Sequence, residues 1–84
     1  MDKRGVREFV VGLLKEKLLL FDISGDELND KFDLVKSGLL DSMAFIDLIA
    51  ETEEKYEIEI DFEKLADSPG FSTMGGLISF IINA

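Results

Sequence analysis

The sequence predicts an all-α fold, a small four-helix bundle with three principal helices, one short helix and a long first loop. Apolar residues recur at helical spacing in four stretches, which lie at about 4–20, 42–56, 62–66 and 73–82. Residues 57–61 alternate like a strand, but no second such pattern exists to pair with them, so we expect an extended connector. A chain of 84 residues supports one small core, which predicts a single domain over residues 1–84.

The first helix and the loop after it each carry one unusual feature. Gly12 lies inside the helix and costs about 1 kcal/mol relative to alanine, which predicts either close packing or a weak point there. Residues 21–41 are rich in turn formers, yet apolar residues interrupt them regularly, so we expect this loop to pack on the core, with a short helical turn near 26–30. A loop of about 20 residues is unusual in a small domain and indicates a functional role.

Side chains that accept hydrogen bonds precede the later helices. Asp41 is expected to cap the second helix, Asp61 the short helix, and Ser72 or Thr73 the last helix. The helical spacing also predicts the core. Its members are Val6, Phe9, Val10, Leu13, Ile46, Ile49, Tyr56, Ile60, Phe62, Leu65, Leu77, Ile78 and Ile81.

Composition narrows the possible functions. The chain has no cysteine and no histidine, which removes disulfides, the usual general base, the usual activated nucleophile and soft zinc ligands. We therefore expect a protein that is not itself an enzyme. The charged residues interleaved near the N-terminus do not form a signal peptide, and the apolar run 77–82 is too short to span a bilayer. These observations predict a soluble, cytoplasmic protein.

The negative charge is concentrated in one segment. The chain has a net charge of -9, and residues 41–64 alone contain nine acidic and two basic side chains. Such a field repels nucleic acid and anionic membranes and attracts basic protein surfaces. We therefore expect basic protein partners, no nucleic acid and no membrane insertion.

Ser42 is the candidate functional residue, because it follows Asp41 inside the first turn of the second helix and its hydroxyl is expected to be exposed. As a catalytic nucleophile it needs a nearby base, and no histidine is present to act as one. Serine at such a position most often helps to cap the helix. The local pattern therefore leaves open whether Ser42 is only structural or is acted upon by another enzyme.

Residues 38–43, Gly-Leu-Leu-Asp-Ser-Met, resemble the modification motif of acyl and peptidyl carrier proteins. The likeness extends over almost the whole chain: a first helix, a long loop ending in the motif, an acidic helix closed by Tyr56, an Ile-x-Ile-Asp connector, a short helix and a Ser-Thr-led last helix. It implies an acyl-carrier-like monomer whose Ser42 receives 4'-phosphopantetheine from coenzyme A through a phosphopantetheinyl transferase. The arm's thiol then holds acyl groups as thioesters in a protein without cysteine.

The resemblance also implies partners and the surface that they contact. We expect partner enzymes to bind the helix that begins at Ser42. These partners are a loading ligase and downstream synthases of fatty-acid, polyketide or related pathways. Asp41 and Met43 frame the arm. The expected partner-binding residues are Asp47, Glu53, Glu54 and a partly exposed Phe45. Glu51 and Thr52 stand where the family often has apolar residues, which predicts a smaller or more polar interior beneath the helix.

Several alternatives stay open at this stage. Asp-Ser-Met in place of Asp-Ser-Leu does not decide between a fatty-acid, polyketide, aminoacyl, peptidyl or D-alanyl carrier. An acidic helical adaptor without a cofactor is a second class. A divalent-ion site is a third, since Asp22, Ser24, Asp26 and Asp33 have partial EF-hand spacing, although Glu27 replaces the required glycine.

Overall fold

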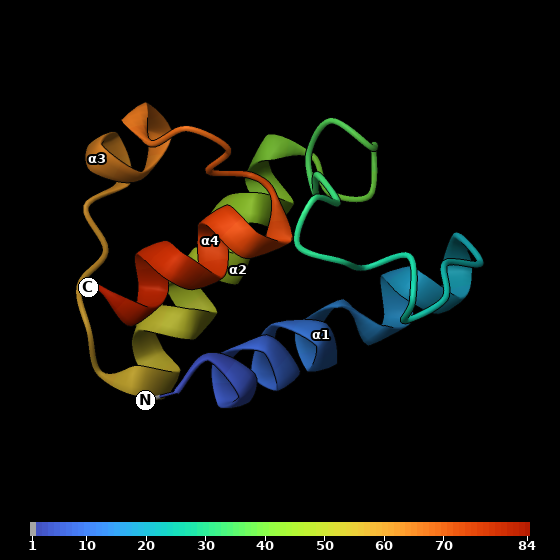
Figure 1. Ribbon diagram of the computed structural model, residues 1–84, viewed down its shortest axis with the longest axis horizontal. Coiled ribbons are helices and arrows are strands. Elements are labelled where there is room, and N and C mark those ends of the chain that lie inside the picture. The colour runs from blue at the N-terminus through green and yellow to red at the C-terminus, as the bar shows by residue number, and fades with distance from the viewer. Residues whose placement is uncertain (1) are drawn as a thin grey trace.

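The computed structural model describes residues 2–84, which form four helices. They are α1 (Lys3–Leu20), α2 (Ser42–Tyr56), α3 (Phe62–Asp67) and α4 (Met74–Ile82) (Figure 1). The predicted all-α fold is confirmed, and each helix begins and ends within one residue of its predicted bounds. Residues 57–61 form the extended connector. No helix in the described part of the chain is long and apolar enough to cross a membrane.

Each helix begins at a local cap that the sequence encodes. Asp41 Oδ1 accepts the amide of Ala44 at 2.8 Å, and Asp61 Oδ1 accepts the amide of Glu63 at 3.0 Å. Thr73, rather than Ser72, caps α4, because its Oγ1 accepts the amide of Gly76 at 3.0 Å. These side chains satisfy amides that have no partner within the helix, which is why the starting residues are predictable from sequence.

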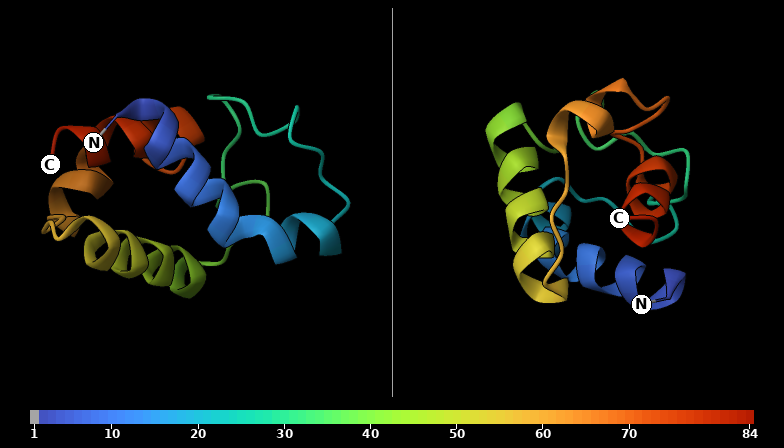
Figure 2. Two further views of the ribbon diagram at one scale, coloured as in Figure 1. Left: turned by 90° about the horizontal axis from the view of Figure 1, so that it is seen from below. Right: turned by 90° about the vertical axis from the view of Figure 1, so that its left-hand side faces the viewer.

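The helices enclose one core. Figure 2 shows α2 along one side of the molecule and α4 on the other, with α1 packed most extensively on α4. The start of α1 and the end of α4 lie at the same end of the molecule (Figure 1). Most of the predicted core residues are buried: Val6, Val10, Ile49, Ile60, Leu65, Leu77, Ile78 and Ile81. Phe9 and Tyr56 are half-buried and meet edge to face, with ring centroids 5.7 Å apart.

Three predicted core residues are exposed instead. Leu13, Ile46 and Phe62 are 36%, 43% and 42% exposed. Adjacent residues on a helix point about 100° apart, so a small rotation of the buried face exchanges one apolar neighbour for the next. In α2 this exchange buries Phe45 in place of Ile46.

The long loop packs on the core as predicted. Leu28, Leu34, Leu39 and Leu40 are all buried. No helix forms at 26–30. Two overlapping tight turns over residues 24–28, in which the amides of Glu27 and Leu28 donate to the carbonyls of Ser24 and Gly25, take the place of the expected helical turn.

Paired glycines at the start of α4 allow two close approaches, one by the same loop and one by the turn at Gly70. The amide of Gly75 donates to the carbonyl of Asp30 at 2.9 Å, and a Cβ on Gly75 would lie 2.8 Å from the Cβ of Asp30. A Cβ on Gly76 would overlap the carbonyl of Gly70. These two glycines therefore allow a contact that any side chain would block. Gly12, in contrast, is exposed and faces open space, which identifies it as a weak point in α1.

Candidate functional site

The loop that leads to Ser42 is anchored at Asp33. Its Oδ1 accepts the amides of Val35 at 3.0 Å and Lys36 at 2.7 Å. The hydroxyl of Ser72, 39 residues away, donates to the same carboxylate at 2.9 Å, and the amide of Leu34 donates to the carbonyl of Ser72 at 2.8 Å. Asp33 thus joins the loop to the segment that begins α4.

The hydrogen bonds at Asp33 also change its acidity. Burial by itself raises the pKa of the Asp33 carboxyl, because a charge is poorly solvated there. The hydrogen bonds from the Lys36 amide, the Ser72 hydroxyl and the Val35 amide outweigh burial and hold the pKa below its ordinary value. The ionised form is therefore the one that holds the loop.

A compact turn carries the chain from Asp33 to the start of α2. The amide of Leu40 donates to the carbonyl of Leu34 at 2.9 Å and closes the turn, while Leu39 and Leu40 bury their side chains. Gly38 adopts φ 86°, a left-handed conformation that a residue with a side chain disfavours. Backbone geometry thus favours the glycine of the motif, and the two leucines fix the end of the loop to the core.

Ser42 is the first residue of α2 and is exposed. Asp41, also exposed, uses its side chain for the Ala44 amide and its carbonyl for the Phe45 amide at 3.0 Å. Within residues 2–84, no acceptor pairs with the amides of Ser42 and Met43. Free amides at the positive end of a helix dipole stabilise a phosphate. An exposed hydroxyl beside them therefore suits the attachment of a phosphate-linked group.

The residues expected to contact partners divide into two groups. Met43 is 67% exposed, and Asp47 and Glu54 are also exposed along α2, so other proteins can reach them; their contact with partners stays a prediction. Glu53 is only half-exposed, because its Oε2 accepts the amide of Ile60 at 2.8 Å and holds the connector to α2. Glu53 therefore has a structural contact that the sequence reasoning missed.

The expected exposure of Phe45 is wrong. The side chain is 2% exposed and meets Phe71 edge to face, with ring centroids 5.9 Å apart. It belongs to the core and does not present a surface to a partner. The predicted polar interior beneath α2 is present at Thr52, which is fully buried and satisfied by a 2.9 Å hydrogen bond from its hydroxyl to the carbonyl of Leu48.

Asp33 and Ser72 are positioning residues that the sequence reasoning did not identify. The sequence signal was present in part, since an Asp two or three residues before a turn often accepts nearby amides. Its partner, Ser72, is too distant in sequence to predict. The Asp33 carboxylate accepts hydrogen bonds from within the protein, and residues 2–84 contain no group of three or more His, Cys, Asp or Glu side chains placed to hold a metal ion.

The fold and the site together define a small all-α domain that presents an exposed serine at the start of α2. Residues 8–78 match the family described as the phosphopantetheine attachment site, and the chain belongs to that family of carrier domains, whose cofactor is 4'-phosphopantetheine.

The chain is also similar in sequence to two curated proteins. Over 44 residues the chain is 34% identical to the D-alanyl carrier proteins of Lactobacillus helveticus and Lactobacillus acidophilus. The match covers 50% of this chain and 56% of each relative, so the chain spans about half the length of the curated relatives it matches. No solved structure matches the chain significantly.

Proposed function

We propose that Ser42 is the residue to which 4'-phosphopantetheine is attached, and that the protein carries acyl intermediates as thioesters between partner enzymes. The observation that carries this proposal is the exposed Ser42 hydroxyl at the first residue of α2, beside two amides without an acceptor in the described chain. Asp41 holds this helix start in place, and Met43 offers an exposed apolar side chain next to the arm.

The arm, when attached, supplies the thiol that this cysteine-free chain lacks. The chain's own residues present the attachment point and hold its geometry through the Asp33 anchor and the Gly38 turn. The partner enzymes carry out the chemical steps. They are the phosphopantetheinyl transferase, a loading ligase and synthases of fatty-acid, polyketide or related pathways. The protein is therefore proposed to be a substrate of enzymes rather than an enzyme, working as a monomer in the cytoplasm.

A second candidate cargo is an aminoacyl group, including D-alanyl. The observation in its favour is that the two relatives matched over half of the chain are D-alanyl carrier proteins. A peptidyl carrier would use the same attachment site.

Mass spectrometry tests the attachment site. The protein is incubated with coenzyme A and a promiscuous phosphopantetheinyl transferase, and wild type should gain the mass of one phosphopantetheinyl group. Ser42→Ala should gain none. Ser24→Ala is the matched control, because Ser24 is an exposed serine of the same loop and its hydroxyl forms no hydrogen bond within residues 2–84, and it should be modified like wild type. Modification of Ser42→Ala, or an unmodified wild type, would contradict the proposal.

Charge reversal tests the partner surface. Asp47→Lys with Glu54→Lys should slow modification at low salt and leave the helical circular dichroism intact, because both side chains are exposed. Salt should weaken the wild-type interaction, since screening lengths fall from about 10 Å at 0.1 M to about 3 Å at 1 M. Equal rates for the variant and wild type at low salt would exclude these acids from the interface.

A further inference from the structure

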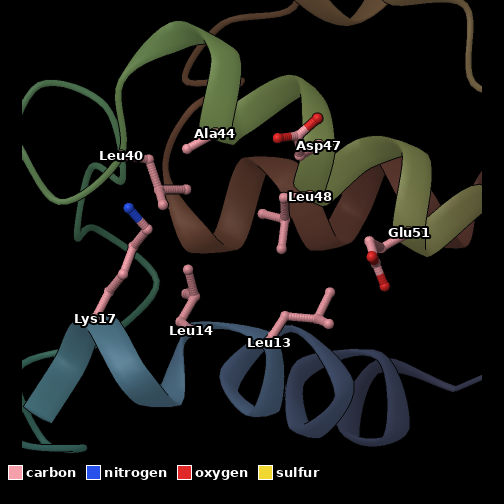
Figure 3. A pocket seen from close by; sticks show the side chains of 8 residues that line it. All are labelled: Leu13, Leu14, Lys17, Leu40, Ala44, Asp47, Leu48 and Glu51. Carbon is pink, nitrogen blue, oxygen red and sulfur yellow. The ribbon is translucent and has the colours of Figure 1, made fainter.

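A cleft of about 230 Å³ separates α1 from α2 near the start of α2 (Figure 3). At the other end of α2, the two helices are joined by the contact between Phe9 and Tyr56. The cleft is bounded at one end by Leu40 and Ala44, each two residues from Ser42 in sequence. It therefore begins beside the proposed attachment point.

The cleft has an apolar floor and a charged rim. Leu14, Leu40 and Leu48 are buried side chains that form the floor. Lys17 extends from α1 toward Leu40, whereas the carboxylates of Asp47 and Glu51 lie along α2 (Figure 3). These two acids are four residues apart, so they occupy neighbouring positions on one face of the helix. The charge thus changes from positive to negative along the cleft.

The charged groups of Lys17, Asp47 and Glu51 on the rim are available to bind a ligand. Within residues 2–84 the ion pairs lie elsewhere, between Asp30 and Lys3 or Arg7 and between Arg4 and Glu8. The volume of about 230 Å³ is below the roughly 300–1,000 Å³ of sites that enclose drug-sized ligands. The cleft therefore suits a short group that has an apolar part and a positive charge.

We propose that this cleft receives a short aminoacyl cargo, with its ammonium group beside the carboxylates of Asp47 and Glu51 and its small side chain on the leucine floor. The proposal rests on the proposed attachment of the arm at Ser42 and names the class of cargo. Lys17 repels an ammonium group from its own end of the cleft and so favours one orientation. The same carboxylates disfavour a cargo that ends in a negative charge.

Nuclear magnetic resonance of the loaded protein tests this assignment. Isotope-labelled protein is loaded by the transferase with stable amide analogues of D-alanyl or propionyl coenzyme A, and loading is checked by mass. The two cargos differ only in the ammonium group. Both should shift the amide signals of Leu14 and Leu48, and only D-alanyl should shift those of Asp47 and Glu51.

Variants separate the rim charges from general effects of loading. Asp47→Asn combined with Glu51→Gln should abolish the difference between the two cargos. Glu16→Gln is the matched control, because Glu16 is an exposed acid of α1 that does not line the cleft, and it should keep the full difference.

Each remaining outcome counts against the proposal in a distinguishable way. Identical spectra for the two cargos, or shifts at Ile46 and Phe62 instead, would overturn the aminoacyl cleft and leave the carrier function intact. If the amide signals of the cleft residues shift only when a partner enzyme is added, the cleft is a docking surface, and this result would also overturn the aminoacyl cleft. A chain that takes up no arm, seen by mass, would overturn both the cleft and the attachment at Ser42.

Discussion

Replacing Asp33 by asparagine should destabilise the protein in a pH-dependent way. The carboxylate accepts three donors at 2.7 to 3.0 Å, from Val35, Lys36 and Ser72. Hydrogen bonds to a charged group contribute about 1.5–3 kcal/mol each, and asparagine keeps one oxygen that can still accept. We therefore expect a loss of about 2 kcal/mol in the free energy of unfolding at neutral pH. In a domain of this size this corresponds to a Tm lower by about 8–16 °C.

The direction of the pKa shift of Asp33 determines how this loss of stability depends on pH. The folded-state pKa of Asp33 lies below its ordinary value, so the unfolded chain binds the proton first as the pH falls. The stabilisation is complete above the ordinary pKa and is lost as the pH drops through the lower folded-state pKa. The difference between wild type and Asp33→Asn should therefore be largest near pH 7 and shrink below about pH 4.

Urea unfolding followed by circular dichroism measures both effects. Asp26→Asn is the matched control, because Asp26 is an exposed acid of the same loop without a hydrogen bond in the described chain, and its effect should be within about 0.5 kcal/mol. A difference between Asp33→Asn and wild type that stays constant across this pH range would refute the role assigned to the Asp33 charge. Equal stability of the two proteins at pH 7 would refute the anchor itself.

Three other substitutions test individual features of the fold by the same unfolding measurement. Gly12→Ala should raise stability by about 1 kcal/mol, because the position is helical, exposed and open; a loss would indicate a hidden contact. Glu53→Ala should cost about 1 kcal/mol through the lost bond to the Ile60 amide, whereas Glu54→Ala should be nearly neutral; equal effects would exclude that bond as the cause. Gly38→Ala should cost about 1–2 kcal/mol because φ is positive there, and an unchanged stability would argue against this backbone conformation.

Features set by short-range chemistry were predictable from the sequence. The start of α2 at Ser42 follows from Asp41, whose carboxylate reaches an amide only three residues away. The motif around Ser42 and the absence of histidine and cysteine pointed to a residue that enzymes act upon, and the family match now assigns the chain to the phosphopantetheine carriers. The burial of the leucines in the long loop was also predictable, because apolar side chains that recur regularly in a polar segment gain free energy when they pack on the core.

Features that depend on distant segments required the tertiary structure. Phe45 and Ile46 are adjacent and equally apolar, and the position of Phe71 decides which of them is buried. The role of Glu53 depends on the path of the connector, and that of Asp33 depends on a serine 39 residues away.

The sequence by itself determined the helices, the caps and the position of Ser42 at the start of α2, because each depends on neighbours within about one helical turn. The tertiary structure decided which face of each helix is buried, how the loop is anchored, and that a cleft with opposite charges on its rim lies between α1 and α2. The physical reason is that packing brings together side chains from segments whose relative placement no local pattern specifies.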